Sequence, residues 1–201
     1  MRKDEKAADE KQQRIDERTD EKKQADEILR AALEYGAKGY RVFPVCCGQK
    51  DSNGEDSWKA PARWRRKWIK WKEEATTDIE KIREWFGGEE LYNIGLVCDG
   101  LIVIDLDTNK DGKKESGFKG IDVLSKRLGS LPSGPQAVTS TGGQHLFFKR
   151  PSDSKLANVN GHTIDGTKYG IDVKTESVDN KGELKLGYVV AAPSIGANGE
   201  P

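Results

Sequence analysis

The sequence predicts an α+β domain built mainly from antiparallel strands. Two pairs of short apolar runs are each joined by a glycine-containing turn, one at Asp99-Gly100 and one at Gly142-Gly143. Asp-Gly between two apolar runs is among the strongest short hairpin signals, whereas parallel strands need long crossover connections. Helical periodicity appears only in short segments outside the runs. Three of these segments lie near residues 28–33, 79–86 and 121–128, and a fourth lies in the basic segment at residues 64–71.

The expected elements follow one another from residue 28 onward. The first helix stops at Gly36 and Gly39, and residues 40–45 then read as a strand. The spacing of Thr77 and Glu80 is that of a capping box, which opens the second helix. After the two pairs of runs, residues 170–174 and 187–191 are the clear remaining strands, with a polar insertion at 175–185.

Composition sets the domain boundary and the environment of the chain. The chain has 201 residues, of which 34% are charged. Residues 1–27 have Ile15 as their only branched aliphatic residue and are predicted to be a charged helical or disordered extension. Residues 28–201 are the predicted folded domain, and the turn-like final residues suit a piece of a longer protein. Without an apolar leader or spanning segment, we expect a cytoplasmic protein with no membrane partner.

The cysteine and histidine content excludes two common classes. Three cysteines at irregular spacing do not make a disulfide framework. With only two histidines besides, no four-ligand zinc pattern can be assembled. Ordinary reduced thiols are therefore expected.

A run of apolar residues ends in two carboxylates, in the sequence IVIDLD from Ile102 to Asp107. Side chains alternate along a strand, so Asp105 and Asp107 share one face while Ile104 and Leu106 point into the other layer. Two neighbouring carboxylates repel unless a cation lies between them. The run is therefore predicted to bind Mg²⁺ or Mn²⁺ and to act on a polyanionic substrate.

Two further strands carry polar residues at the same alternating spacing. His145 and Lys149 share one face of their strand, and Asp172 and Lys174 share a face of theirs. In one sheet, these groups and the aspartates would converge on one surface. Such a set suits nucleotide transfer, because acidic residues hold cations that bridge phosphate oxygens while His and Lys neutralise a triphosphate. The Gly142-Gly143 turn is expected to offer backbone N–H groups to phosphates.

Residues 58–72 form the most basic segment and contain no acidic residue. Trp64, Trp68 and Trp71 fall at i, i+4 and i+7, which predicts one side of a helix, with Trp68 and Trp71 as core contacts. Cations on the other faces suit contact with the phosphates of a DNA strand without reading its sequence. The residues assigned to DNA binding are Arg63, Arg65, Arg66, Lys67 and Lys70.

In their order along the chain, these segments resemble the primase-polymerase domain of the archaeo-eukaryotic primase superfamily, of the bifunctional type found in plasmid and phage replication proteins. Residues 104–107 (IDLD) match its metal-binding hDhD motif, residues 143–145 (GQH) its nucleotide-binding sxH motif, and Ile171-Asp172 its third acidic motif. Residues 188–194 match the closing strand and the small-residue turn. The resemblance runs from about Ile28 to the C-terminus.

The resemblance implies an RNA-recognition-like antiparallel sheet and a template-dependent nucleotidyltransferase that makes primers or extends DNA by a two-metal mechanism. Its partners would be single-stranded or primed DNA, nucleoside triphosphates and a helicase domain or protein. Asp105, Asp107 and Asp172 would be the catalytic metal ligands, with Asp165 and Glu176 as substitutes for the third. The nucleotide-binding residues would be His145, Gly143, Thr141, Lys174, Lys149, Ser194 and Lys59, with Ser140 or Thr141 supplying the hydroxyl that Gly143 lacks.

Two other functions remain as alternatives. Residues 104–108 (IDLDT) also resemble the nucleophile strand of haloacid-dehalogenase-like phosphatases, with Asp105 as nucleophile and Asp107 as acid/base. That class needs α/β alternation and a parallel sheet, which the predicted hairpins oppose. The non-enzymatic alternative is a primase-like module that only binds DNA or nucleotides in a replication initiator. Such a binder has no need to keep repelling carboxylates together with His145.

Overall fold

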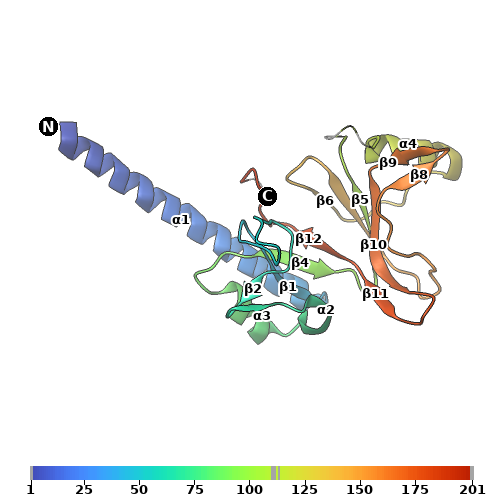
Figure 1. Ribbon diagram of the computed structural model, residues 1–201, viewed down its shortest axis with the longest axis horizontal. Coiled ribbons are helices and arrows are strands. Elements are labelled where there is room, and N and C mark those ends of the chain that lie inside the picture. The colour runs from blue at the N-terminus through green and yellow to red at the C-terminus, as the bar shows by residue number, and fades with distance from the viewer. Residues whose placement is uncertain (1, 110–111, 113, 200–201) are drawn as a thin grey trace.

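The protein is an α+β fold with mostly antiparallel strands, as the sequence predicts. The structure, a computed structural model, describes the backbone of residues 2–109, 112 and 114–199, and side chains from residue 20 onward. Two lobes lie side by side, each built around one sheet, and the long helix α1 projects from the first (Figure 1). No helix in the described ranges combines the length and apolar character needed to cross a bilayer.

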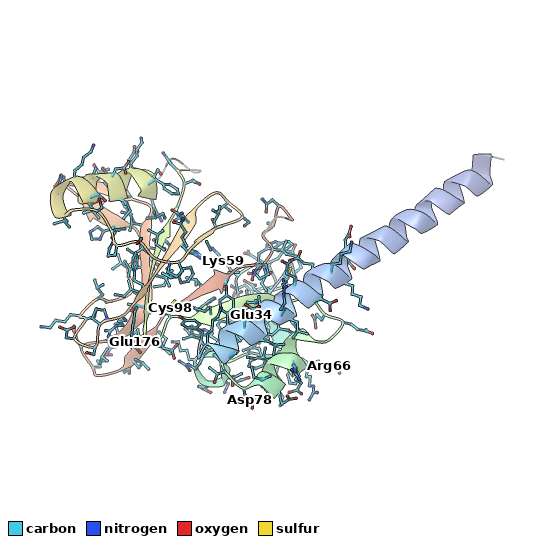
Figure 2. The ribbon with its side chains drawn as sticks, turned by 180° about the vertical axis from the view of Figure 1, so that it is seen from behind. Glu34, Lys59, Arg66, Asp78, Cys98 and Glu176 are labelled. Atoms are coloured by element: carbon cyan, nitrogen blue, oxygen red, sulfur yellow. The ribbon has the colours of Figure 1, made fainter. Side chains whose placement is uncertain are left out.

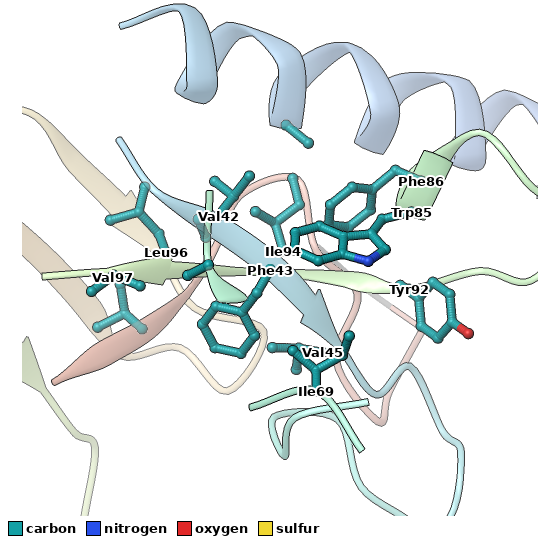
Figure 3. Close-up of a cluster of buried hydrophobic side chains, with 14 of the residues drawn as sticks. Val42, Phe43, Val45, Ile69, Trp85, Phe86, Tyr92, Ile94, Leu96 and Val97 are labelled. Atoms are coloured by element: carbon teal, nitrogen blue, oxygen red, sulfur yellow. The ribbon is translucent and has the colours of Figure 1, made fainter. Parts of the chain in front are cut away.

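The first lobe is a three-stranded sheet in the order β1-β4-β12, packed against α1 and α3. Every residue of β1 (Val42–Val45) and β4 (Asn93–Val97) is buried, and β12 (Tyr188–Ala191) pairs antiparallel with β4. Pro44 is tolerated because β1 is an edge strand. Figure 3 shows Val42, Ile94 and Leu96 of this sheet on the same side as Trp85 and Phe86 of α3 (Ile79–Phe86).

Helix α1 (Arg2–Ala37) runs without a break through residue 28. Ile28 and Ala32 are buried against the first lobe, as their spacing predicts. Contact with the folded body begins earlier, because the side-chain amide of Gln24 donates to the Pro193 carbonyl at 3.1 Å. The division of the chain at residues 27 and 28 stays a prediction.

The second lobe is a five-stranded sheet in the order β11-β10-β5-β7-β6. Its central strand β5 (Leu101–Leu106) pairs antiparallel with β10 (Ile171–Val178) and with β7 (Gln144–Lys149). Ile104 and Leu106 pack with Ile121 and Leu124 of α4, so this helix covers one face and leaves Asp105 on the other. The remaining elements are α4 (Gly117–Leu128), β6 (Gln136–Val138), β8 (His162–Ile164), β9 (Thr167–Tyr169) and β11 (Leu184–Leu186).

The predicted hairpin between residues 93–98 and 101–106 is wrong. The turn at Asp99-Gly100 exists, with Gly100 at φ 68°, but it carries the chain from β4 in the first sheet to β5 in the second. Each strand is flanked on both sides by strands distant in sequence, so neither has an edge free for the other. The pair β6–β7, in contrast, forms the expected hairpin.

The helix predicted over residues 58–72 is also wrong. This segment forms a small hairpin, β2 (Arg63–Trp64) and β3 (Lys67–Trp68), followed by the single turn α2 (Trp71–Glu74). Arg65 and Arg66 sit at its tip with φ of 48° and 66°, a conformation usually supplied by Asn-Gly. Trp68 is 37% exposed and is no core contact. Trp71 stacks on Phe43, with ring centroids 5.6 Å apart.

The predicted cap of α3 needs a smaller correction. Asp78, not Thr77, caps α3, because its carboxylate accepts the N–H groups of Glu80 and Lys81 at 2.9 and 3.4 Å. The polar insertion at 175–185 forms a hairpin, in which β10 continues to Val178 and pairs with β11.

Candidate active site

A row of polar side chains crosses the middle of the five-stranded sheet. Asp105 on β5 lies directly opposite Asp172 on β10 and opposite His145 on β7. The Nε2 atom of the buried His145 is 3.5 Å from Oδ1 of Asp105. The antiparallel register therefore brings together three groups that are far apart in the sequence, on the face that α4 leaves uncovered.

This row faces a cleft of about 820 Å³ between the two sheets. The opposite wall comes from the first lobe and includes Lys59 and Ser194. Figure 2 shows Lys59 between the two lobes. Carboxylates on one wall and lysines around them make a site suited to phosphate groups accompanied by cations. Other residues that line it include Asp107, Lys114, Ser140, Thr141, Lys174 and Tyr188.

The carboxylates share one electrostatic environment. Burial, and then the neighbouring charges of Asp105 and Asp172, raise the pKa of Asp107 above its usual value. Lys114, with Nζ 3.8 Å from Oδ2 of Asp107, and Lys59 act in the opposite direction. Burial and the two neighbouring carboxylates therefore outweigh the lysines, so a divalent cation at this place would favour the ionised form of Asp107.

Asp172, and not its substitutes, is the third carboxylate of the cleft. Its Oδ1 accepts the Gly161 N–H at 2.7 Å, and its Oδ2 accepts from Lys174 Nζ at 3.1 Å. Asp165 instead pairs with Arg127 of α4. Glu176 lies 3.9 Å from Arg150 and does not line the cleft.

The donor set fits a cation that is shared with substrate. Within the described residues, no three His, Cys, Asp or Glu side chains gather closely enough to hold an ion by themselves. Mg²⁺ characteristically binds one or two carboxylates and completes its shell with water and substrate phosphates. Asp105 and Asp107 would supply those carboxylates, with Asp172 beside them once Lys174 is displaced.

Three backbone segments cross at Asp107 and fix its position. Its N–H donates to the Gly170 carbonyl at 2.7 Å, and its own carbonyl accepts the Gly117 N–H at 2.9 Å. A Cβ added to Gly170 would lie 2.8 Å from the Asp107 Cβ, closer than real Cβ contacts allow. The end of β5, the start of α4 and the start of β10 therefore meet only because glycine permits the approach.

Replacing Gly170 by alanine is expected to displace Asp107 and to lower the free energy of unfolding by about 1–3 kcal/mol. Urea denaturation measures the loss. Gly88→Ala is the matched control, since an added Cβ there meets no atom within 4 Å. Equal stability of the two variants would contradict a close approach of the chain segments at Gly170 and Asp107.

The turn between β6 and β7 does not offer its glycine amides to a ligand. The Gly142 N–H donates to the Thr139 carbonyl at 2.8 Å, and the Gly143 N–H donates to Thr139 Oγ1 at 2.9 Å. The prediction that these N–H groups contact phosphates is therefore wrong. Gly143 is needed for packing instead, because a Cβ there would lie 2.7 Å from the Leu106 carbonyl oxygen. Thr139, Ser140 and Thr141 are the residues of this turn that line the cleft.

Asn93 holds the opposite wall of the cleft together, a role that the sequence analysis did not predict. It is fully buried, and its Nδ2 donates to backbone carbonyls that include those of Trp58 at 3.2 Å and Ile195 at 2.7 Å. Its Oδ1 accepts the Ile195 N–H at 2.8 Å. One side chain thus holds together the loops that carry Lys59 and Ser194. The only signal was an amide at the start of an apolar run.

Several residues predicted for the site lie elsewhere. Lys149 is exposed opposite Leu101, at the far end of β7, and does not line the cleft. The basic hairpin is also outside it, and Figure 2 shows Arg66 well apart from Lys59. The hairpin residues concerned are Arg63, Arg65, Arg66, Lys67 and, just after it, Lys70.

An antiparallel sheet that places carboxylates, an imidazole and lysines in one cleft is typical of enzymes that act on polyphosphates with divalent cations. The chain belongs to the Prim-Pol family, described as bifunctional DNA primase/polymerase, N-terminal, whose family model matches residues 32–201. No curated protein and no solved structure matches the chain significantly. Family membership confirms the resemblance to primase-polymerase domains and indicates an activity of the primase/polymerase type in general. Because β5 pairs antiparallel with both of its neighbours, this sheet is not the parallel sheet that a dehalogenase-like phosphatase needs.

Proposed function

We propose that the domain catalyses template-dependent nucleotidyl transfer in the cleft between its two sheets. The 3′-hydroxyl of a primer, or of a first nucleotide in de novo priming, attacks the α-phosphate of a nucleoside triphosphate, and pyrophosphate leaves. The observation that carries this proposal is the row Asp172, Asp105 and His145 across three strands, facing Lys59.

The two walls of the cleft contribute different groups to this reaction. Asp105, Asp107 and Asp172 would hold Mg²⁺ or Mn²⁺, which in a two-metal site stabilises charge on the attacking and leaving oxygens. His145 and Lys174 lie on the same sheet and neutralise the phosphates of the bound triphosphate. Lys59 reaches them from the opposite lobe. The hydroxyls of Thr141, Ser140 and Ser194 are available as hydrogen-bond donors to phosphate oxygens.

The family match supports a role in DNA replication, and the bifunctional type points to plasmid, phage or mobile-element replication. A single-stranded or primed DNA would be the template. A helicase domain or partner protein would supply the unwound strand. The cytoplasm is the compartment where such a template occurs.

Incorporation of labelled nucleotides on a single-stranded template tests the proposal. We expect products with Mg²⁺ or Mn²⁺, with and without a primer, and none in EDTA. Gel separation of the products distinguishes primer synthesis from primer extension. Failure to extend an annealed primer with either cation and either type of sugar would refute the proposed activity.

One observation favours a second function, a module that binds DNA or nucleotides without catalysis. Both oxygens of Asp172 are already engaged, by the Gly161 N–H and by Lys174. A protein that only binds DNA or nucleotides would keep these two hydrogen bonds. In an enzyme, the carboxylate of Asp172 must be freed from them to bind the metal. Template binding without incorporation in the same assay would establish the binding module.

A further inference from the structure

We propose that the β2–β3 hairpin is a second DNA-binding surface, separate from the cleft, on which the exposed ring of Trp68 stacks with a base of a single strand. The proposal takes from the proposed function only that DNA is the ligand. It does not require catalysis.

The two faces of the hairpin differ. Trp64 and Lys67 are paired across one face, where the Trp64 ring is covered by Arg65 at 4.1 Å and by Lys81 at 4.2 Å from its centroid. Arg63 and Trp68 are paired on the other face. There the Arg63 guanidinium lies 5.1 Å from the Trp68 ring centroid. Trp68 is 37% exposed, so part of its surface remains free for a ligand.

The charge around Trp68 is uncompensated. Arg65 forms an ion pair with Glu84 at 2.8 Å, which ties it to α3. Within the described part of the chain, Arg63, Arg66, Lys67 and Lys70 form no ion pair with a carboxylate. Arg66 stands at the tip of the hairpin, where its positive φ turns the chain.

An exposed tryptophan beside unpaired cations is the combination that binds single-stranded nucleic acid. The cations contact phosphates, and the ring stacks on a base whatever its identity. A duplex hides its bases in the stack, so it would use the cations and not the ring. The hairpin therefore fits the unpaired part of a template strand, held at a distance from the reacting end.

The test is fluorescence anisotropy with a labelled single strand and the matched duplex, in EDTA and without nucleotides, using the full chain. Trp68→Ala is expected to weaken single-strand binding roughly 10-fold and duplex binding less than about twofold. Trp68→Phe keeps an aromatic ring and should retain most of the affinity. Phe118→Ala is the matched control, since Phe118 is 39% exposed on α4 and lies outside the hairpin. It should bind like the wild type.

A salt titration separates the contribution of the charges. Replacing Arg66 and Lys67 together by alanine should reduce the slope of log Kd against log salt by roughly 0.7 for each phosphate that the variant no longer neutralises. Single-strand affinity of Trp68→Ala equal to that of Phe118→Ala, or equal losses on single strand and duplex, would overturn the stacking proposal. A chain that binds a single strand through Trp68 but incorporates no nucleotide would refute the proposed activity and leave this surface established.

Discussion

Replacing Asp105 and Asp107 together by asparagine is expected to lower nucleotide incorporation by about 10³-fold or more. The two carboxylates stand on the cleft face of β5 and at its end, where they would supply the negative charge that holds the cations. Binding of a single strand in EDTA should change less than about twofold, because the basic hairpin is elsewhere. Primer extension and anisotropy on the same preparation measure both quantities. Activity within tenfold of the wild type would contradict the assignment.

The stability of Asp107→Asn shows whether such a loss of activity is chemical or structural. Because the pKa of Asp107 is raised, its ionised form destabilises the folded state. In EDTA, the variant should therefore melt slightly above the wild type at pH 7, by less than about 3 °C for a partly exposed group. The advantage should vanish below the usual carboxyl pKa of 3.8, where the wild-type side chain is protonated in both states. A lower melting temperature at pH 7 would contradict the destabilisation that the raised pKa of Asp107 implies.

Replacing Asn93 by alanine is expected to lower the free energy of unfolding by about 2–3 kcal/mol. The substitution leaves the part-buried N–H of Ile195 without its acceptor at 2.8 Å. It also removes the amide donor from the Trp58 and Ile195 carbonyls. Urea denaturation measures the change.

Two companion variants make the Asn93 result specific. Asn53→Ala, on an exposed loop, should change stability by less than about 0.5 kcal/mol. Asn93→Asp keeps the acceptor but exchanges the amide donor for a buried charge, so it should be at least as damaging as alanine. Stability of Asn93→Ala within about 0.5 kcal/mol of the wild type would show that these hydrogen bonds do not hold the wall.

Local patterns predicted much of the fold and part of the site. Alternation along residues 102–107 placed Asp105 on the face opposite Ile104 and Leu106, as observed. The turn at Gly142-Gly143 correctly predicted the β6–β7 hairpin. The apolar spacing at 79–86 correctly predicted α3. Each of these depends on residues within a few positions of one another.

The failures share a different cause. The turn at Asp99-Gly100 is real, but it joins two sheets, because β4 and β5 each find both their partners elsewhere in the chain. The turn at Arg65-Arg66 has positive φ without asparagine or glycine, so its residues carried no signal for a hairpin. With the hairpin missed, Trp68 was assigned to a core that it does not enter.

By itself, the sequence determined the α+β class, the shared face of the first two aspartates and the family, because strand periodicity and motif order are properties of the chain as written. Only the tertiary structure decided which groups meet. It set Asp172 and His145 beside Asp105, brought Lys59 across the cleft and left Lys149 outside it. The physical reason is that strand partners are chosen by packing between segments tens of residues apart, and no local pattern records that choice.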